Sequence, residues 1–141
     1  MNPPLRGKEN NEPLWEALAG GVIDTVGSDN CACLRSDKEG DIWHAACGFA
    51  GTATILPVLL SEGYHKGRIS LQRIAEVTSF NAANIFNMAP RKGTLQPGAD
   101  ADLCLVDLDL EKTVDAADLG SYSDFSVFEG RTLKGLSLIH I

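Results

Sequence analysis

The segment from Val22 to Asn30 constrains the fold of this chain more than any other. Residues 22–26 have the length and apolar content of one buried strand, and the chain then turns into Gly27-Ser28-Asp29. A carboxylate at the carboxyl end of a strand stands where α/β barrels and open α/β sheets hold their catalytic groups. Because an unpaired carboxylate is costly away from water, we expect Asp29 to meet a cation, a metal ion or several hydrogen-bond donors.

Charge and hydropathy exclude several classes of partner. The formal net charge is -7, and no cluster of Lys and Arg with interleaved aromatic residues occurs, which argues against nucleic acid and anionic membranes. No apolar run approaches the roughly 18 residues of a membrane span. The first residues lack the apolar core of a signal peptide. The sequence therefore predicts a cytoplasmic protein that binds neither nucleic acid nor a membrane.

The cysteines allow two interpretations. An intracellular protein keeps Cys31, Cys33, Cys47 and Cys104 as thiols, and we favour this interpretation. The alternative is a small zinc module with ligands Cys31, Cys33, His44 and Cys47. These ligand types suit zinc, but a Cys-x-Cys pair lacks the usual gap of two to four residues.

Local signals predict helices first and strands later. We expect a helix over residues 12–19, capped by Asn11 and ended by Gly20-Gly21, and a long functional loop over residues 30–49. Apolar periodicity predicts further helices over 52–62, 71–77 (capped by Ser70) and 81–86. After Lys92-Gly93 we expect short strands over 103–106, 113–114, 125–127 and 132–133. The chain thus changes from α/β to all-β near residue 92.

The last six residues, Leu136-Ser137-Leu138-Ile139-His140-Ile141, form an apolar hexamer without turn residues. They resemble the in-frame translation of a transposon-end adapter used in sequencing libraries, and we interpret residues 136–141 as such an artefact. The alternative is a genuine final strand.

Seven short motifs lie along the chain between Asn2 and about Gly135. They are Asn2-Pro3-Pro4-Leu5-Arg6, Leu14-Trp15, Val26-Gly27-Ser28-Asp29, Leu56-Pro57-Val58-Leu59-Leu60, Thr78-Ser79-Phe80-Asn81-Ala82-Ala83, Pro90-Arg91-Lys92-Gly93 and Gly98-Ala99-Asp100-Ala101-Asp102-Leu103. In sequence and in order these motifs resemble one enzyme family, the cyclic-amide amidohydrolases, which comprise hydantoinases, dihydropyrimidinases, dihydroorotases and allantoinases.

This resemblance implies an α/β fold in which the chain is the C-terminal portion of a metal-dependent (β/α)8 TIM barrel plus part of a flanking small β-sandwich. Residues 1–92 would hold the loop after strand 7, strand 8 and the closing helices, and residues 93–135 would belong to the sandwich. A complete barrel needs about 250 residues, so the chain is expected to be a fragment of a longer parent. The parent is expected to be a homo-oligomer, a dimer or a tetramer.

The resemblance also implies the chemistry. Asp29 matches the family's catalytic aspartate, which binds a divalent metal ion in a centre that is usually binuclear zinc, and which moves a proton from water to the departing nitrogen of a small cyclic amide. Asn2, Cys47 and Gly48 match positions that contact substrate, although Cys47 stands where relatives often have Asn. Asn30 replaces a common His, and this departure affects substrate orientation or specificity.

The remaining metal ligands are not evident in this chain. The family uses a His-x-His pair, a carboxylated Lys and two further His, whereas this chain has only His44, His65 and His140, none in a matching motif. A catalytic zinc needs about three protein ligands. We therefore expect the isolated chain to be inactive. The alternative is that the parent is a non-catalytic, amidohydrolase-like assembly protein, which an upstream His-x-His strand would exclude.

Overall fold

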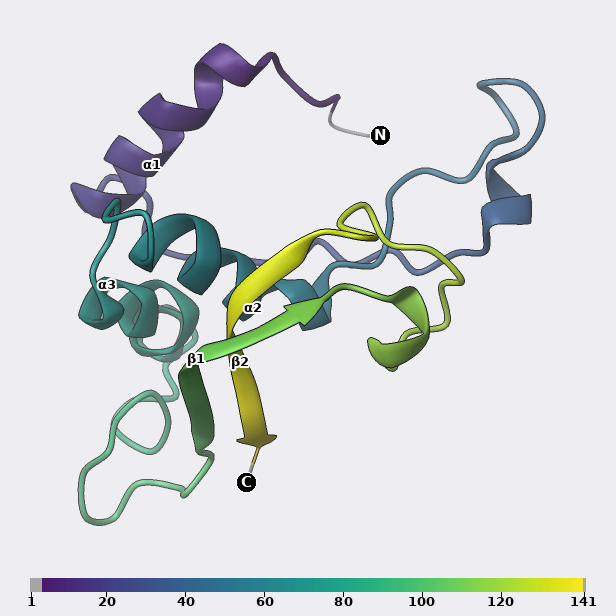
Figure 1. Cartoon of the computed structure of the whole chain (residues 1–141). Helices are drawn as coiled ribbons and strands as arrows, with labels where there is room; N and C mark the ends of the chain where they lie inside the picture. Colours follow the sequence, from purple (N-terminus) through teal and green to yellow (C-terminus); the bar gives the residue numbers. More distant parts are fainter. Residues whose placement is uncertain (1–3, 141) are drawn as a thin grey trace.

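The computed structural model describes residues 4–140, and of residues 136–140 only the backbone (Figure 1). Helix α1, Asn11–Ala19, follows a 3-10 turn, η1, Lys8–Asn10. It ends as expected at the two glycines: the Val22 amide donates to the Ala17 carbonyl (2.9 Å), and Gly21 has φ 82°. The predicted cap is wrong, because Asn11 is the first helical residue and no side chain caps the helix.

The strand predicted over residues 22–26 is not formed within the part of the chain that the structure describes. No described strand pairs with this segment, which lies instead along the helices that follow in the sequence. The Val26 amide donates to the Val77 carbonyl (2.9 Å), and the side chains of Arg73 and Asn81 donate to the carbonyls of Ile23 and Asp24 (2.7 and 2.8 Å). A strand needs a neighbour to pair with, and residues 4–140 supply none here.

Two long helical runs form the rest of the first part. The first comprises η3, Thr52–Thr54, α2, Ile55–Val58, and the π-helical η4, Leu59–Tyr64, and confirms the helix expected over 52–62. The second comprises α3, Leu71–Ala75, the π-helical η5, Glu76–Phe80, and α4, Asn81–Ile85. It joins the two helices predicted over 71–77 and 81–86. Ser70 caps it as expected, since its Oγ accepts the Arg73 amide at 3.1 Å.

The second part contains one antiparallel pair of strands, β1, Cys104–Thr113, and β2, Thr132–His140, with the short 3-10 turn η6, Ala116–Asp118, after β1. The strands expected over 103–106 and 132–133 are parts of these longer strands. The strand expected over 125–127 is wrong, because the Ser126 carbonyl and hydroxyl accept the amides of Glu129 and Phe128 and close a turn. The described residues therefore contain one two-stranded sheet, and the sandwich expected over residues 93–135 stays a prediction.

The backbone of residues 136–140 forms the outer half of β2 and pairs with Cys104–Asp107. Pairing of this kind is open to any apolar segment beside a free strand edge. The adapter interpretation of residues 136–141 thus stays a prediction.

One core holds the two parts together. Leu18, Leu60 and Val77 are among its buried residues, and Val106 and Leu108 of β1 pack against it. In Figure 1 the two strands accordingly cross beside α2. The boundary predicted at residue 92 stays a prediction. Among the described residues, no helix has the length and apolar content needed to cross a membrane.

Candidate functional site

Asp29 lies in the turn after residues 22–26, with an exposed side chain and a φ of 44°. Among the described residues, only Asp29 and Asn87 have a positive φ without being glycine. Side chains disfavour this conformation, although Asp and Asn tolerate it better than others. Such backbone conformations gather at functional sites. Asp29 thus combines an exposed carboxylate with a backbone conformation that needs support from its surroundings.

A second segment, residues 49–52, bonds to both sequence neighbours of Asp29. The Asn30 Oδ1 accepts the Gly51 amide (3.0 Å), and the Ser28 Oγ lies 3.3 Å from the Thr52 Oγ1. One residue further, the Cys31 amide donates to the Phe49 carbonyl (3.1 Å). Residues 28–31 and 49–52, which we call the Asp29 clamp, therefore form one unit although the intervening loop is long.

Gly48, which directly precedes the second segment of the Asp29 clamp, allows the backbone to approach Cys31 closely. Its φ is 86°, and a Cβ at this position would lie 2.6 Å from the Cβ of Cys31. Lys38 also binds residues 46–48, since its ammonium donates to the carbonyls of Ala46 (2.8 Å) and Gly48. Cys47 has an exposed side chain next to these contacts. The structure thus brings Gly48 beside the Asp29 turn.

Residues 121–125, which we call the tail, bind the loop that follows Asp29. The Cys33 amide donates to the buried Ser123 Oγ (3.0 Å), and the Arg35 amide donates to the Asp124 Oδ1 (2.7 Å). The cations of Arg35 and Lys38 lie 5.5 and 5.8 Å from the ring centre of Phe125. These contacts join residues about 90 positions apart, and no local pattern in the sequence indicated them.

A hollow of about 350 Å³ opens beside the Asp29 clamp. Asn30, Gly51 and Thr52 line it from the clamp, and Ser121 and Tyr122 line it from the tail. Alanine side chains and Leu119 line the rest, so the wall combines apolar surface with a few hydroxyl groups and one carboxamide, as small-molecule sites commonly do.

The zinc module is wrong. Within residues 4–135, whose side chains the structure describes, no three side chains of His, Cys, Asp or Glu come together as a metal site. Cys33 is buried, whereas Cys31 and Cys47 are exposed, and the His44 Nδ1 lies 2.6 Å from the Asp41 Oδ1. Asp29 is likewise not part of such a group among the described side chains, so its predicted role as a metal ligand stays a prediction. These residues alone do not fit a binuclear zinc centre.

Two further residues complete the account of the predicted positions. Asn2 lies outside the described residues. His65 has an exposed side chain whose Nε2 lies 2.8 Å from the Leu108 carbonyl oxygen, so it joins η4 to β1 and lies apart from the Asp29 clamp.

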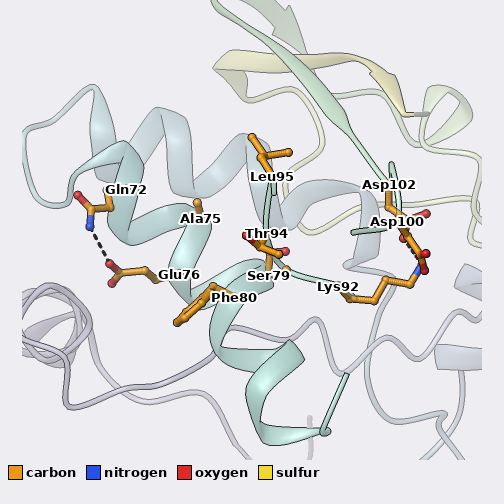
Figure 2. Close-up of a pocket in the computed structure, with 11 residues that line it drawn as sticks. Gln72, Ala75, Glu76, Ser79, Phe80, Lys92, Thr94, Leu95, Asp100 and Asp102 are labelled. Atoms are coloured by element: carbon orange, nitrogen blue, oxygen red, sulfur yellow. Dashed lines mark hydrogen bonds and ion pairs between the residues drawn. The ribbon is translucent and has the colours of Figure 1, made fainter. Parts of the chain in front are cut away.

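A larger hollow, of about 500 Å³, lies between the second helical run and residues 92–102 (Figure 2). On the side of residues 92–102, Lys92 pairs with Asp100 (2.9 Å) and Asp102. Hydrogen bonds to these carboxylates raise the pKa of Lys92, and the ammonium lowers the pKa of Asp100. Asp29 does not line it, and we interpret this cluster as a clamp on the 92–102 loop.

Comparisons with known proteins agree on one family. The model of the "Amidohydrolase family" matches residues 3–133. An L-hydantoinase of Paenarthrobacter aurescens is 44% identical over 140 residues, which are 97% of this chain and 31% of that protein. A dihydroorotase of Halobacterium salinarum is 43% identical over 130 residues, 92% of this chain and 30% of that protein.

Solved structures give the same result. A D-hydantoinase from Bacillus sp. AR9 matches all of this chain with a TM-score of 0.95 and 38% identity. An L-hydantoinase from Arthrobacter aurescens matches it with a TM-score of 0.94 and 42% identity. Each match covers 32% of the solved chain. The present chain spans about a third of the length of these relatives.

Proposed function

The chain belongs to the amidohydrolase family, and we propose that it is the C-terminal third of a metal-dependent enzyme that hydrolyses a C–N bond of a cyclic amide. Relatives named for hydantoin and dihydroorotate support this substrate class, because both compounds are cyclic amides. The ring of the parent's substrate is then a hydantoin, a dihydropyrimidine, dihydroorotate or allantoin.

We propose further that residues 22–29 become the last strand of a (β/α)8 barrel in the parent, and that residues 93–135 are part of its sandwich. The segment 22–26 has no partner strand within residues 4–140, and strands from the other two thirds of the parent would pair with it. Asp29 would then stand at the carboxyl end of a barrel strand, the face at which such barrels carry out catalysis.

The observation that carries the function is the exposed carboxylate of Asp29 on a turn that is held from both sides. During hydrolysis, the oxygen of water bonds to the ring carbonyl carbon, and the C–N bond breaks. As a carboxylate, Asp29 accepts the proton of the attacking water and then donates it to the departing ring nitrogen. The carboxylate returns to its starting state, so the step is catalytic.

The proposed cofactor is a divalent metal, binuclear zinc by resemblance, which lowers the pKa of bound water and polarises the carbonyl. Asp29 is the ligand that we assign to this chain, and the rest of the parent would supply the others. The isolated chain is accordingly inactive. We also propose that the parent is a cytoplasmic homo-oligomer and that Asn2, Cys47 and Gly48 contact its substrate.

The test requires the contiguous reading frame on both sides of this chain. The parent is expressed, loaded with Zn²⁺ and assayed on hydantoin, dihydrouracil, dihydroorotate and allantoin. We expect turnover of at least one ring, and a fall in kcat of about 10²-fold or more in the variant Asp29→Asn. Asparagine has the shape of aspartate and tolerates a positive φ, so the turn persists.

The matched control is Asp24→Asn, which removes an exposed carboxylate five residues earlier on the same segment and should leave kcat unchanged. Full activity of Asp29→Asn would contradict the role of Asp29. A wild-type parent that opens no ring, from a reading frame without a His-x-His pair, would instead identify the assembly protein.

A further inference from the structure

The two sequence neighbours of Asp29 both bond to one short segment. Ser28 is paired through its hydroxyl with Thr52, and Asn30 through its carboxamide with the amide of Gly51. Because Ser28 and Asn30 flank Asp29 directly, these bonds determine where the Asp29 turn begins and ends. No bond of the Asp29 side chain itself is needed for this.

The bond from Asn30 is the stronger constraint of the two. It is shorter, 3.0 Å against 3.3 Å, and its donor is a main-chain amide whose residue is buried. A buried amide that loses its acceptor is costly, so the carboxamide of Asn30 keeps residue 51 and the turn together.

The turn itself needs such a constraint. A residue with a φ of 44° relaxes toward negative φ unless its surroundings prevent it, and relaxation would rotate the carboxylate of Asp29. In an active site, a displacement of about 1 Å can reduce the rate about 10²-fold. Asn30 also lines the hollow of about 350 Å³, so the residue that holds the turn borders the space beside it.

We propose that Asn30 is a positioning residue for Asp29: its side-chain oxygen binds the Gly51 amide and thereby fixes the direction of the Asp29 carboxylate in the reaction. This proposal rests on the proposed function. It assigns Asn30 an effect on kcat that exceeds its effect on KM, because the residue acts through Asp29 and not through contact with substrate.

The experiment uses the full-length, zinc-loaded parent and three variants, each assayed at about pH 8. Asn30→Leu keeps the size of the side chain and removes the acceptor. Asn30→His restores an acceptor at the same place, because Nδ1 of His is bonded to Cγ as Oδ1 of Asn is. At about pH 8 an ordinary imidazole is neutral, so this nitrogen can accept a hydrogen bond. Ser123→Ala is the control, because it removes a different side-chain acceptor, a hydroxyl that binds the Cys33 amide of the same loop.

We expect Asn30→Leu to lower kcat about 10- to 100-fold with KM within about threefold of wild type. Asn30→His should recover most of this loss. The Gly51 amide, followed by hydrogen exchange, should exchange faster in Asn30→Leu and remain protected in Asn30→His. Ser123→Ala should lower Tm and leave kcat unchanged.

Two results with an active parent would overturn the role of Asn30 and leave the proposed function standing. In the first, Asn30→Leu keeps the wild-type kcat. In the second, Ser123→Ala lowers kcat as much as Asn30→Leu does for the same loss of Tm, so that the fall in kcat reflects lost stability. A wild-type parent without turnover would overturn the proposed function, and the role of Asn30 with it.

Discussion

Replacing Gly48 by alanine is expected to open the Asp29 clamp. The new methyl group would lie 2.6 Å from the Cβ of Cys31, well inside van der Waals contact, and would sit on a backbone with φ 86°. The left-handed conformation costs a residue with a side chain about 1–2 kcal/mol. Overpacking against a fixed neighbour adds about 1–3 kcal/mol. The free energy of opening should therefore fall by about 2–5 kcal/mol.

Native-state hydrogen exchange of the full-length parent measures this loss locally. The reporter is the Cys31 amide, which donates to the Phe49 carbonyl next to Gly48. A loss of about 2 kcal/mol or more corresponds to exchange that is about 30-fold faster or more.

Gly40 provides the matched control. Its φ is 99°, and a Cβ there meets nothing within 4 Å, so Gly40→Ala carries the cost of the backbone alone. Its reporter is the Ala46 amide, whose bond to the Asp37 carbonyl (2.7 Å) closes the loop around Gly40. We expect this amide to exchange about 5- to 30-fold faster, which corresponds to about 1–2 kcal/mol.

The second control is the double variant Cys31→Gly/Gly48→Ala, which removes the atom that the new methyl group meets. It should be more stable than the sum of the two single variants predicts. An effect of Gly48→Ala no larger than that of Gly40→Ala, or an additive double variant, would refute the reasoning from close contact.

Two further predictions concern stability. Ser70→Ala removes the hydroxyl that accepts the Arg73 amide, and should lower the free energy of unfolding by about 1 kcal/mol in urea titrations; an unchanged midpoint would contradict the cap. The pKa of Glu62 is lowered from 4.5, first by the hydrogen bond from Lys66 and then by the charges of Lys66, Arg131 and Arg68. Since its folded pKa lies below the unfolded value, Glu62 stabilises the protein fully above about pH 4.5, and this contribution is lost as pH falls toward the folded pKa. Glu62→Gln should therefore lower Tm at pH 7 and have less effect at pH 3, and an equal loss at both values would contradict the ionic origin.

Local features of the sequence predicted the helices well. Gly20-Gly21 ends α1, and Ser70 caps α3, because these signals act within one helical turn. The segment 22–26 was predicted as a strand from its composition, yet strand pairing depends on distant neighbours that residues 4–140 do not contain.

At the candidate site, too, local features were predictable from the sequence and long-range contacts were not. The turn residues Gly27-Ser28-Asp29 marked the candidate carboxylate in the sequence. The bond from Asn30 to Gly51 spans 21 positions, and the brace from Ser123 spans 90. Contacts of this length are determined by tertiary packing, so no periodicity or local motif indicates them.

The most direct test of the account is a crystal structure of the zinc-loaded parent, with the metal located by anomalous scattering. We predict that a carboxylate oxygen of Asp29 lies about 2.0–2.2 Å from a metal ion and that Asn30 still accepts the Gly51 amide. An Asp29 side chain directed away from every metal ion would contradict the central claim.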